Sequence, residues 1–234
     1  MKTLSTKDNL QILHEDNHII VVNKRVGDIV QADKTGDEPL SEVVKQYLKD
    51  KYQKPGEVFL GVVHRLDRPT TGIVVFARTS KALSRLNELF KNRETQKTYW
   101  AVVKNPPPKT ADRLEHYLRR NEKNNTSKAH VKEVPESKHA SLDYRVIAQL
   151  QHYTALEVDL HTGRHHQIRA QLSAIGCAIK GDLKYGADRS NPDGGIHLHA
   201  RRLGFIHPVS KIQMTLVAPV PDEPLWRAID MEIT

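Results

Sequence analysis

The chain has 234 residues, with 36 Lys and Arg against 28 Asp and Glu, so its formal net charge is +8. Hydrophobic residues make up 38% and charged residues 27%, which is typical of folded globular proteins and excludes disordered and fibrous classes. The positive charge favours a polyanionic partner.

Compartment and membrane roles follow from what the sequence lacks. Cys177 is the single cysteine, so no internal disulfide can form. The first residues contain no apolar run of secretory-signal length, and no window approaches the ~18 consecutive apolar residues of a membrane span. We therefore expect a cytoplasmic protein with no membrane partner.

The positive charge lies in two blocks. Residues 61–104 hold 9 basic and 3 acidic side chains, and residues 161–211 hold 8 and 3, whereas the remaining 139 residues hold 19 and 22. A charge that only solvates the surface would be spread evenly, so we expect the fold to bring both blocks to one basic face.

Buried strands and amphipathic helices alternate along the first half of the chain. Apolar runs predict strands at 18–23, 72–77 and 98–103. Helical spacing predicts a helix from Leu40 to the breaker near Lys54, and another after the candidate cap Thr79. This alternation is typical of a mixed α/β fold.

The second half continues the mixed pattern. Residues 119–139 have little apolar content and several turn formers, so we expect an exposed loop or hairpin there. Strands are predicted at 141–148, 154–160, 197–206 and 212–218, with a helix at 164–175. With no repeat and no linker, residues 1–234 are expected to form a single domain.

Asp67 lies in the most unusual segment, between Arg65 and Arg68 and directly before a predicted buried strand. A loop that feeds a sheet is a frequent place for a catalytic group, and an ionised aspartate can act as nucleophile or base without a metal. Composition alone favours a structural ion pair over this role. Both interpretations stay open at this point.

A second cluster of polar residues surrounds the start of the helix predicted at 164–175. Ile168, Leu172 and Ile175 form its apolar stripe, while His165 and Arg169, four residues apart, would share a neighbouring face. Together with His166 and the free N–H groups of the helix start, they predict a site for an anion or carboxylate.

Metal and nucleotide sites are not supported. His161 and His165 have the spacing of a helical metal pair, but Gly163 lies between them and no Glu stands as in H-E-x-x-H. His197 and His199 alternate on a strand and face opposite ways. The glycines form no phosphate-binding or dinucleotide signature, so we expect no metal and no cofactor.

The predicted strand at 98–103 carries an aromatic side chain of interest. Strand alternation places Lys97 and Tyr99 on one face and Trp100 on the other. Tyr99 packs in the core by default, but its ring can also stack on a base while its hydroxyl serves a proton transfer.

Three motifs, in this order and spacing, resemble the RluA-type RNA pseudouridine synthases: HRLDRPTTGIVVFART (64–79), KTYWAVV (97–103) and LHTGRHHQIRAQLSAIGCAIKGDLKYG (160–186). The likeness covers about residues 11–218. It implies one catalytic domain, with a mostly antiparallel, bent central sheet flanked by helices and two lobes around a basic cleft. It also implies isomerisation of uridine in structured RNA, with ribosomal RNA favoured over transfer RNA.

Roles for individual residues follow from this resemblance. Asp67 matches the catalytic aspartate, Arg169 the arginine that pairs with it, and Tyr99 the active-site tyrosine. Arg65 matches the arginine that fills the space left by the flipped nucleotide. Neighbouring side chains of the same motifs are expected to contact RNA: His64, Arg68, Lys97, Arg164 and His165.

The isomerisation conserves atoms, so neither metal, cofactor nor bound nucleotide is needed, and a monomer with an RNA partner is expected. Lys24-Arg25 replaces the usual Lys-Pro, Thr70-Thr71 replaces Thr-Ser, and His165-His166 replaces Thr-His. The family's frequent N-terminal S4 module is not expected, which leaves target choice to loops such as 119–139. A non-catalytic RNA-binding or ribosome-assembly protein on the same scaffold is the alternative.

Overall fold

The computed structural model describes residues 3–33 and 35–233. The chain divides into two compact units: unit 1 comprises Met1–Gln96 and Ala200–Pro219, and unit 2 comprises Lys97–His199 and Val220–Thr234. Strands and helices occur in both units. The pairs β1–β2, β2–β4, β3–β4 and β10–β11 of unit 1 are antiparallel, as are β5–β9, β8–β9, β6–β8 and β6–β7 of unit 2. The mixed α/β class with a mostly antiparallel sheet, predicted from the sequence, is confirmed.

Unit 1 is built on the apolar strand β2 (Ile19–Lys24), which pairs with β4 (Thr71–Ala77) so that Lys24 lies opposite Gly72. The strand order is β1–β2–β4–β10, with β3 on β4 and β11 on β10. The bounds of the other strands are β1 Ile12–Glu15, β3 Gly61–Val62, β10 Leu198–Ile206 and β11 Gln213–Val217.

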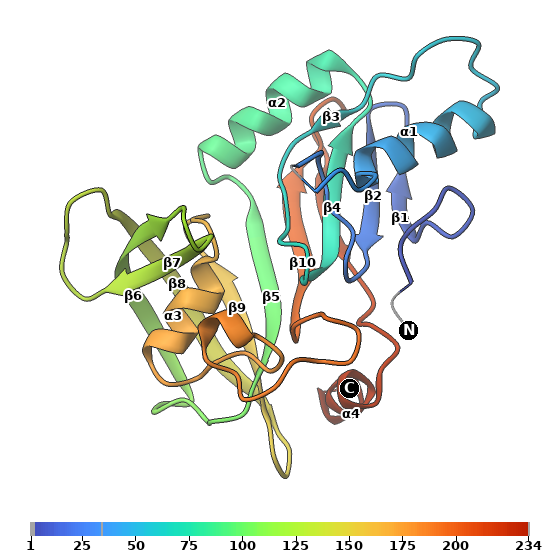
Figure 1. Cartoon of the computed structure of the whole chain (residues 1–234). Helices are drawn as coiled ribbons and strands as arrows, with labels where there is room; N and C mark the ends of the chain where they lie inside the picture. The colour runs from blue at the N-terminus through green and yellow to red at the C-terminus, as the bar shows by residue number, and fades with distance from the viewer. Residues whose placement is uncertain (1–2, 34, 234) are drawn as a thin grey trace. The chain divides into compact units, whose positions relative to one another are not determined.

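Two helices cover opposite faces of these strands, because alternate residues of β2 and β4 enter different cores. Helix α1 (Leu40–Lys51) packs against Ile20, Val22, Val74 and Phe76. Helix α2 (Ser80–Lys91) packs against Ile19, Val21, Ile73 and Val75, with Phe205 of β10. Figure 1 shows both helices beside these strands. The predicted cap is present, since the Thr79 side chain accepts a hydrogen bond from the Ala82 N–H.

Gly72, the second residue of β4, has a backbone angle φ of +115°, a conformation that L side chains rarely adopt. A Cβ atom here would lie 2.4 Å from the Ala200 carbonyl oxygen of β10. The glycine is therefore required by the close approach of two backbones just after the segment that carries Asp67.

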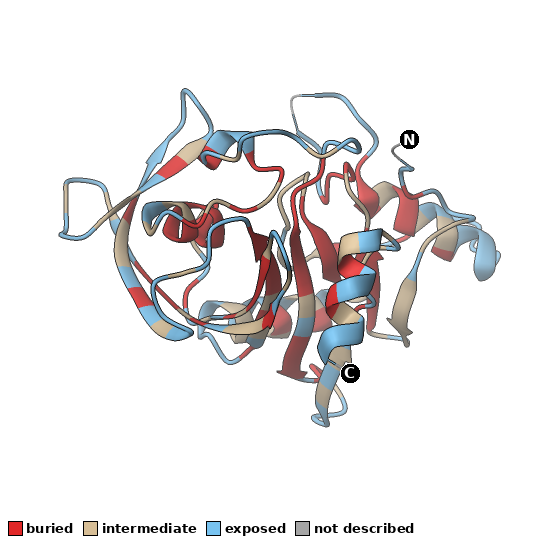
Figure 2. Ribbon diagram, turned by 90° about the horizontal axis from the view of Figure 1, so that it is seen from below, coloured by how far each residue is buried: buried red, intermediate tan, exposed pale blue. Residues whose placement is uncertain are grey.

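Unit 2 contains a second run of antiparallel strands, in the order β5–β9–β8–β6–β7. Their bounds are β5 Gln96–Val103, β6 Ala111–Asn121, β7 Thr126–His130, β8 Lys138–Gln149 and β9 Thr154–Leu160. Helix α3 (Gln167–Ala174) packs through Ile168 and Leu172 on the core of β5, β8 and β9. Helix α4 (Pro224–Ile233) covers Trp100 and Val102 with Trp226 and Ile229, and its outer side is exposed (Figure 2).

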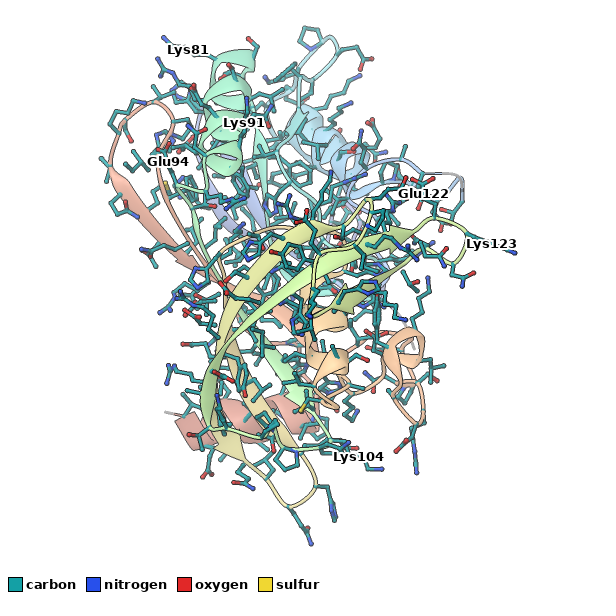
Figure 3. The ribbon with its side chains drawn as sticks, turned by 90° about the vertical axis from the view of Figure 1, so that its left-hand side faces the viewer. Lys81, Lys91, Glu94, Lys104, Glu122 and Lys123 are labelled. Atoms are coloured by element: carbon teal, nitrogen blue, oxygen red, sulfur yellow. The ribbon has the colours of Figure 1, made fainter. Side chains whose placement is uncertain are left out.

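Strands β6 and β7 form a hairpin whose turn lies within the segment expected to be a loop or hairpin, with Asn121 opposite Thr126. Leu118, Ala129 and Ala140 of β6, β7 and β8 pack toward α3, where they meet Ala170 and Tyr185. Arg119 and Lys128 pair on the other face and are exposed. Figure 3 labels Glu122 and Lys123 at the turn of this hairpin.

Two expectations need correction. The helix predicted at 164–175 begins only at Gln167, because His166 adopts a left-handed conformation with φ of 52°. His165 therefore precedes the helix and does not share a helical face with Arg169. Strand β6 begins at Ala111, before the expected loop or hairpin, and α4 was not predicted.

Along the described chain, no helix is long and apolar enough to cross a membrane.

Candidate active site

The segment that carries Asp67 is an irregular stretch between β3 and β4. The Asp67 carbonyl oxygen accepts a hydrogen bond of 3.0 Å from the Thr70 N–H, which closes a turn, and Asp67 is half-buried. The loop position expected from the sequence is thus observed. A half-buried carboxyl group at the entrance of a buried strand is well placed for chemistry on a bound molecule.

Lys24 fixes the backbone of this turn through hydrogen bonds. Its side chain is buried at the end of β2, with 1% of the residue exposed. The Nζ atom donates to three backbone carbonyl oxygens: those of Arg25 at 3.0 Å, Arg68 at 3.1 Å and Thr70 at 2.7 Å. The lysine therefore fixes the backbone directly after Asp67 through all three N–H groups of its ammonium.

From the sequence, Lys24-Arg25 is only a departure from the family's Lys-Pro. The signal for the role of Lys24 was available, since a lysine ends the otherwise buried run IIVVNK. A buried lysine needs a full set of acceptors, and the turn that follows Asp67 supplies it.

The three RNA-contact candidates in the same segment as Asp67 are His64, Arg65 and Arg68, and each has a different environment. The His64 ring stacks on Phe90 with ring centres 4.8 Å apart, and its Nε2 accepts a 3.1 Å hydrogen bond from the Val75 N–H. Arg68 forms an ion pair with Asp37. Arg65 is exposed. His64 thus ties the segment to β4 and α2, while Arg65 extends toward solvent.

Strand β5 positions Tyr99 and Lys97 as strand alternation predicts. Tyr99 packs partly buried against the core of β8, β9 and α3, whereas Trp100 enters the core under α4. Lys97 lies along Gly163, because a Cβ atom there would be 3.7 Å from the lysine Nζ. Lys97 and the stretch that leads into α3 are therefore neighbours in unit 2.

Arg169 of α3 is buried and carries a partner that the sequence did not reveal. Its Nε and Nη2 atoms donate to the two carboxylate oxygens of Asp182, at 2.6 and 2.8 Å. Its guanidinium also lies over the Tyr185 ring, 5.0 Å from the ring centre. Asp182 and Tyr185 belong to the turn and short 3-10 helix η1 (Leu183–Tyr185) after α3.

A bidentate pair with a ring beneath it allows the guanidinium little freedom. Only 4% of the arginine side chain and 1% of the Asp182 side chain are exposed. Asp182 therefore holds the guanidinium in one orientation.

The residues before α3 connect this helix to the hairpin. His166 is buried, and its Nδ1 lies 2.9 Å from the Tyr185 hydroxyl. The His165 Nδ1 lies 3.0 Å from Ser127 Oγ of β7, and its Nε2 lies 3.1 Å from Asn125 Oδ1. Arg164 donates from Nε to the His139 carbonyl oxygen of β8 at 2.9 Å.

The structure thus gathers the candidates within each unit. In unit 1, His64, Arg65, Asp67 and Arg68 share one short segment. In unit 2, Arg164 and His165 precede the helix that carries Arg169. Within residues 3–33 and 35–233, no three His, Cys, Asp or Glu side chains gather as metal ligands.

Known proteins resemble this chain in sequence and in fold. Residues 18–174 match the family model described as RNA pseudouridylate synthase. The chain is 33% identical to "Ribosomal large subunit pseudouridine synthase D" of Zymomonas mobilis, over 92% of this chain and 70% of that protein. The protein of the same name from Xylella fastidiosa is 32% identical, over 92% and 67%.

A solved structure agrees with these matches. "Human RNA Pseudouridylate Synthase Domain Containing 4" superposes with a TM-score of 0.79 at 25% sequence identity, covering 95% of this chain and 92% of that chain. The match thus extends over nearly the whole of both chains.

Proposed function

The chain belongs to the RNA pseudouridylate synthase family, and on that premise we propose that it converts specific uridines of structured ribosomal RNA to pseudouridine. In this proposal Asp67 is the essential catalytic carboxylate. The observation that carries the proposal is Asp67 itself, in the motif HRLD within the matched residues, on a turn that Lys24 fixes.

The reaction breaks the glycosidic bond between N1 and C1′ of uridine and forms a bond between C5 and C1′. The C5 hydrogen leaves and N1 gains one, so that the product has the atoms of the substrate. Asp67 attacks C1′, attacks C6 or removes a sugar proton; all three routes need an ionised, oriented carboxylate. None needs an electron carrier.

Arg169 and Tyr99 serve Asp67 and the base in this proposal. Arg169 holds the Asp67 carboxylate and leaves one of its oxygens available for reaction. Its pair with Asp182 supports this role, because a guanidinium held on one edge presents the other in a constant direction. Tyr99 stacks on the uracil as it turns, or assists removal of the C5 proton.

The target uridine must leave its stack before the chemistry can begin, at a cost of roughly a few kcal/mol. Arg65 is exposed, which suits a side chain that fills the space left by the flipped nucleotide. Lys97, Arg164 and the β6–β7 hairpin, with Arg119 and Lys128 on its exposed face, would hold the surrounding RNA. The large-subunit ribosomal RNA is the proposed substrate, from the names of the relatives.

Replacing Asp67 with Asn tests the assignment. Because the amide cannot act as nucleophile or base, we expect pseudouridine formation to fall by at least about 100-fold. RNA affinity should stay within about threefold, since one side chain of a wide polar interface changes little. Pseudouridine mapping of ribosomal RNA from cells with the wild-type gene, with the variant and without the gene measures the first quantity and names the site.

The matched control is Asp50→Asn, because Asp50 is an exposed aspartate of the same unit that pairs with Lys7. It should modify RNA at the wild-type rate. Full activity in Asp67→Asn would overturn the catalytic assignment. Identical pseudouridine maps with and without the gene, in both ribosomal and transfer RNA, would favour the non-catalytic RNA-binding alternative.

A further inference from the structure

Asp28 is a buried aspartate in the loop that follows β2, with 6% of the residue exposed. Its carboxyl oxygens accept three hydrogen bonds. Oδ1 accepts from the Ser5 N–H at 3.0 Å, and Oδ2 accepts from the Ser5 hydroxyl at 2.7 Å and from the Arg25 N–H at 3.1 Å. Asp28 thus joins the loop of residues 25–28 to an N-terminal segment, residues 4–9.

Arg25 fastens the N-terminal segment at a second point. Its Nη2 atom donates to the Asn9 carbonyl oxygen at 2.9 Å. Inside the segment, the Asn9 side chain accepts from the Thr6 N–H at 2.8 Å and donates to the Leu4 carbonyl oxygen at 3.2 Å. Proline, the family's usual residue at position 25, has neither an N–H nor a guanidinium. Both contacts of Arg25 are therefore features of this chain.

The same loop holds the backbone that follows Asp67. The Gly27 N–H donates to the Arg68 carbonyl oxygen at 2.9 Å, and the Lys24 Nζ donates to the same oxygen at 3.1 Å. Gly27 precedes Asp28 directly in the chain, and Arg68 follows Asp67 directly. A movement of the loop would therefore be passed to the turn of Asp67 through one hydrogen bond between neighbouring residues.

We infer that Asp28 is a positioning residue that fixes the loop after β2 against the N-terminal segment and, through the Gly27 N–H, keeps the turn of Asp67 in one place. The consequence for the reaction rests on the proposed function. Lys24 fixes the same turn by binding carbonyl oxygens, whereas Asp28 fixes the loop by accepting from N–H and hydroxyl groups. The turn thus has two separate supports.

Hydrogen exchange in the full chain, without RNA, tests the fastening directly. In Asp28→Asn an NH2 group replaces one carboxyl oxygen, so at least one of the two backbone N–H groups that Asp28 accepts loses its acceptor. We expect exchange at the Gly27 and Thr70 amides to accelerate at least about tenfold, the effect of one lost hydrogen bond in a buried site. The buried Leu86 amide of α2 reports general destabilisation and should accelerate less.

Enzyme kinetics separate positioning from RNA binding. Asp28→Asn should lower kcat about tenfold and leave KM for RNA within about twofold, because a displaced Asp67 slows the chemical step while a buried side chain does not contact RNA. Ser5→Ala removes only the hydroxyl donor and should lower kcat about threefold. In the double variant the two losses should be less than multiplicative, because both act through one hydrogen-bonded group.

Two controls match these variants. Asp8→Asn removes an exposed carboxyl group of the N-terminal segment and should change neither kcat nor exchange at the Gly27 amide. Thr79→Ala removes the side-chain cap of α2 in the same unit. It should lower the midpoint of urea denaturation about as much as Asp28→Asn does, yet leave kcat within about twofold.

Each outcome decides one question. If the Gly27 and Thr70 amides of Asp28→Asn accelerate no more than the Leu86 amide, the fastening is wrong. Wild-type kcat in Asp28→Asn, with the faster exchange present, would show that the loop does not position Asp67 and would overturn the inference. In a chain that modifies no RNA, faster exchange confined to Gly27 and Thr70 would support the inference, and only the proposed function would fail.

Discussion

Asp182 is the buried carboxylate that orients the Arg169 guanidinium. Both side chains of the Arg169–Asp182 pair are almost fully buried, and Asp182→Asn breaks this pair by removing its negative charge. We expect the free energy of unfolding to fall by about 3–5 kcal/mol. Urea denaturation at neutral pH measures the loss, and Asp188→Asn, which removes the exposed partner of Lys104, should cost far less.

The double variant Arg169→Met/Asp182→Leu separates stability from chemistry. Replacing both members of a buried pair with apolar side chains is often neutral or stabilising, so most of the lost stability should return. Pseudouridine formation should not return, because Arg169 is the proposed partner of Asp67. An active double variant would show that the pair is only structural.

The sequence identifies Arg169 as a candidate residue, but it does not identify Asp182 as the partner of Arg169. The motif that contains Arg169 also contains Asp182, yet thirteen residues and a change of direction separate them. Neither helical nor strand periodicity predicts such a contact. Lys24 shows the same limit: its position at the end of a predicted buried strand is visible in the sequence, but two of its three carbonyl acceptors lie 44 and 46 residues further along the chain.

Among the secondary-structure elements, β2 and the turn after Asp67 act together through Lys24. In Lys24→Met the side chain keeps its length but donates nothing, which leaves three carbonyl oxygens without this donor. We expect kcat to fall by about 100-fold, because displacement of Asp67 by about 1 Å is enough for such a loss. Single-turnover rates measure this, with exposed Lys54→Met as the control.

Binding of RNA by Lys24→Met should change less than its rate, since a buried lysine does not reach the RNA. A variant with normal single-turnover rates would show that the turn keeps its shape without the ammonium. Circular dichroism of the folded variant distinguishes a shifted turn from general unfolding.

The sequence predicts the strands that have many apolar residues, and it does not predict the strands and helices that bury only a few side chains. The strands at 18–23, 72–77 and 154–160 agree with β2, β4 and β9 to within a residue at each end. Strands β2 and β4 are buried along their whole length, which selects apolar side chains, and β9 alternates apolar and polar residues in its second half. In β6 only Leu114 and Leu118 are buried, and in α4 only Trp226 and Ile229. Two buried residues are too few to show a period.

For the molecule as a whole, the location of positive charge makes a prediction that net charge alone does not. The two basic blocks hold the proposed catalytic motifs, while the rest of the chain is slightly acidic. If RNA lies across the blocks, the slope of log Kd against log salt should depend on charges within them and little on charges elsewhere.

Two variants with the same loss of charge test this expectation. Arg65→Ser/Lys184→Ser removes one exposed cation from each block, and Lys49→Ser/Lys54→Ser removes two exposed cations outside them. The first should lower the salt slope by about 2, because each phosphate contact contributes about one, and the second should leave it unchanged. Filter binding of a ribosomal RNA fragment from 50 to 300 mM KCl measures both, and equal slopes would place the RNA elsewhere on the protein.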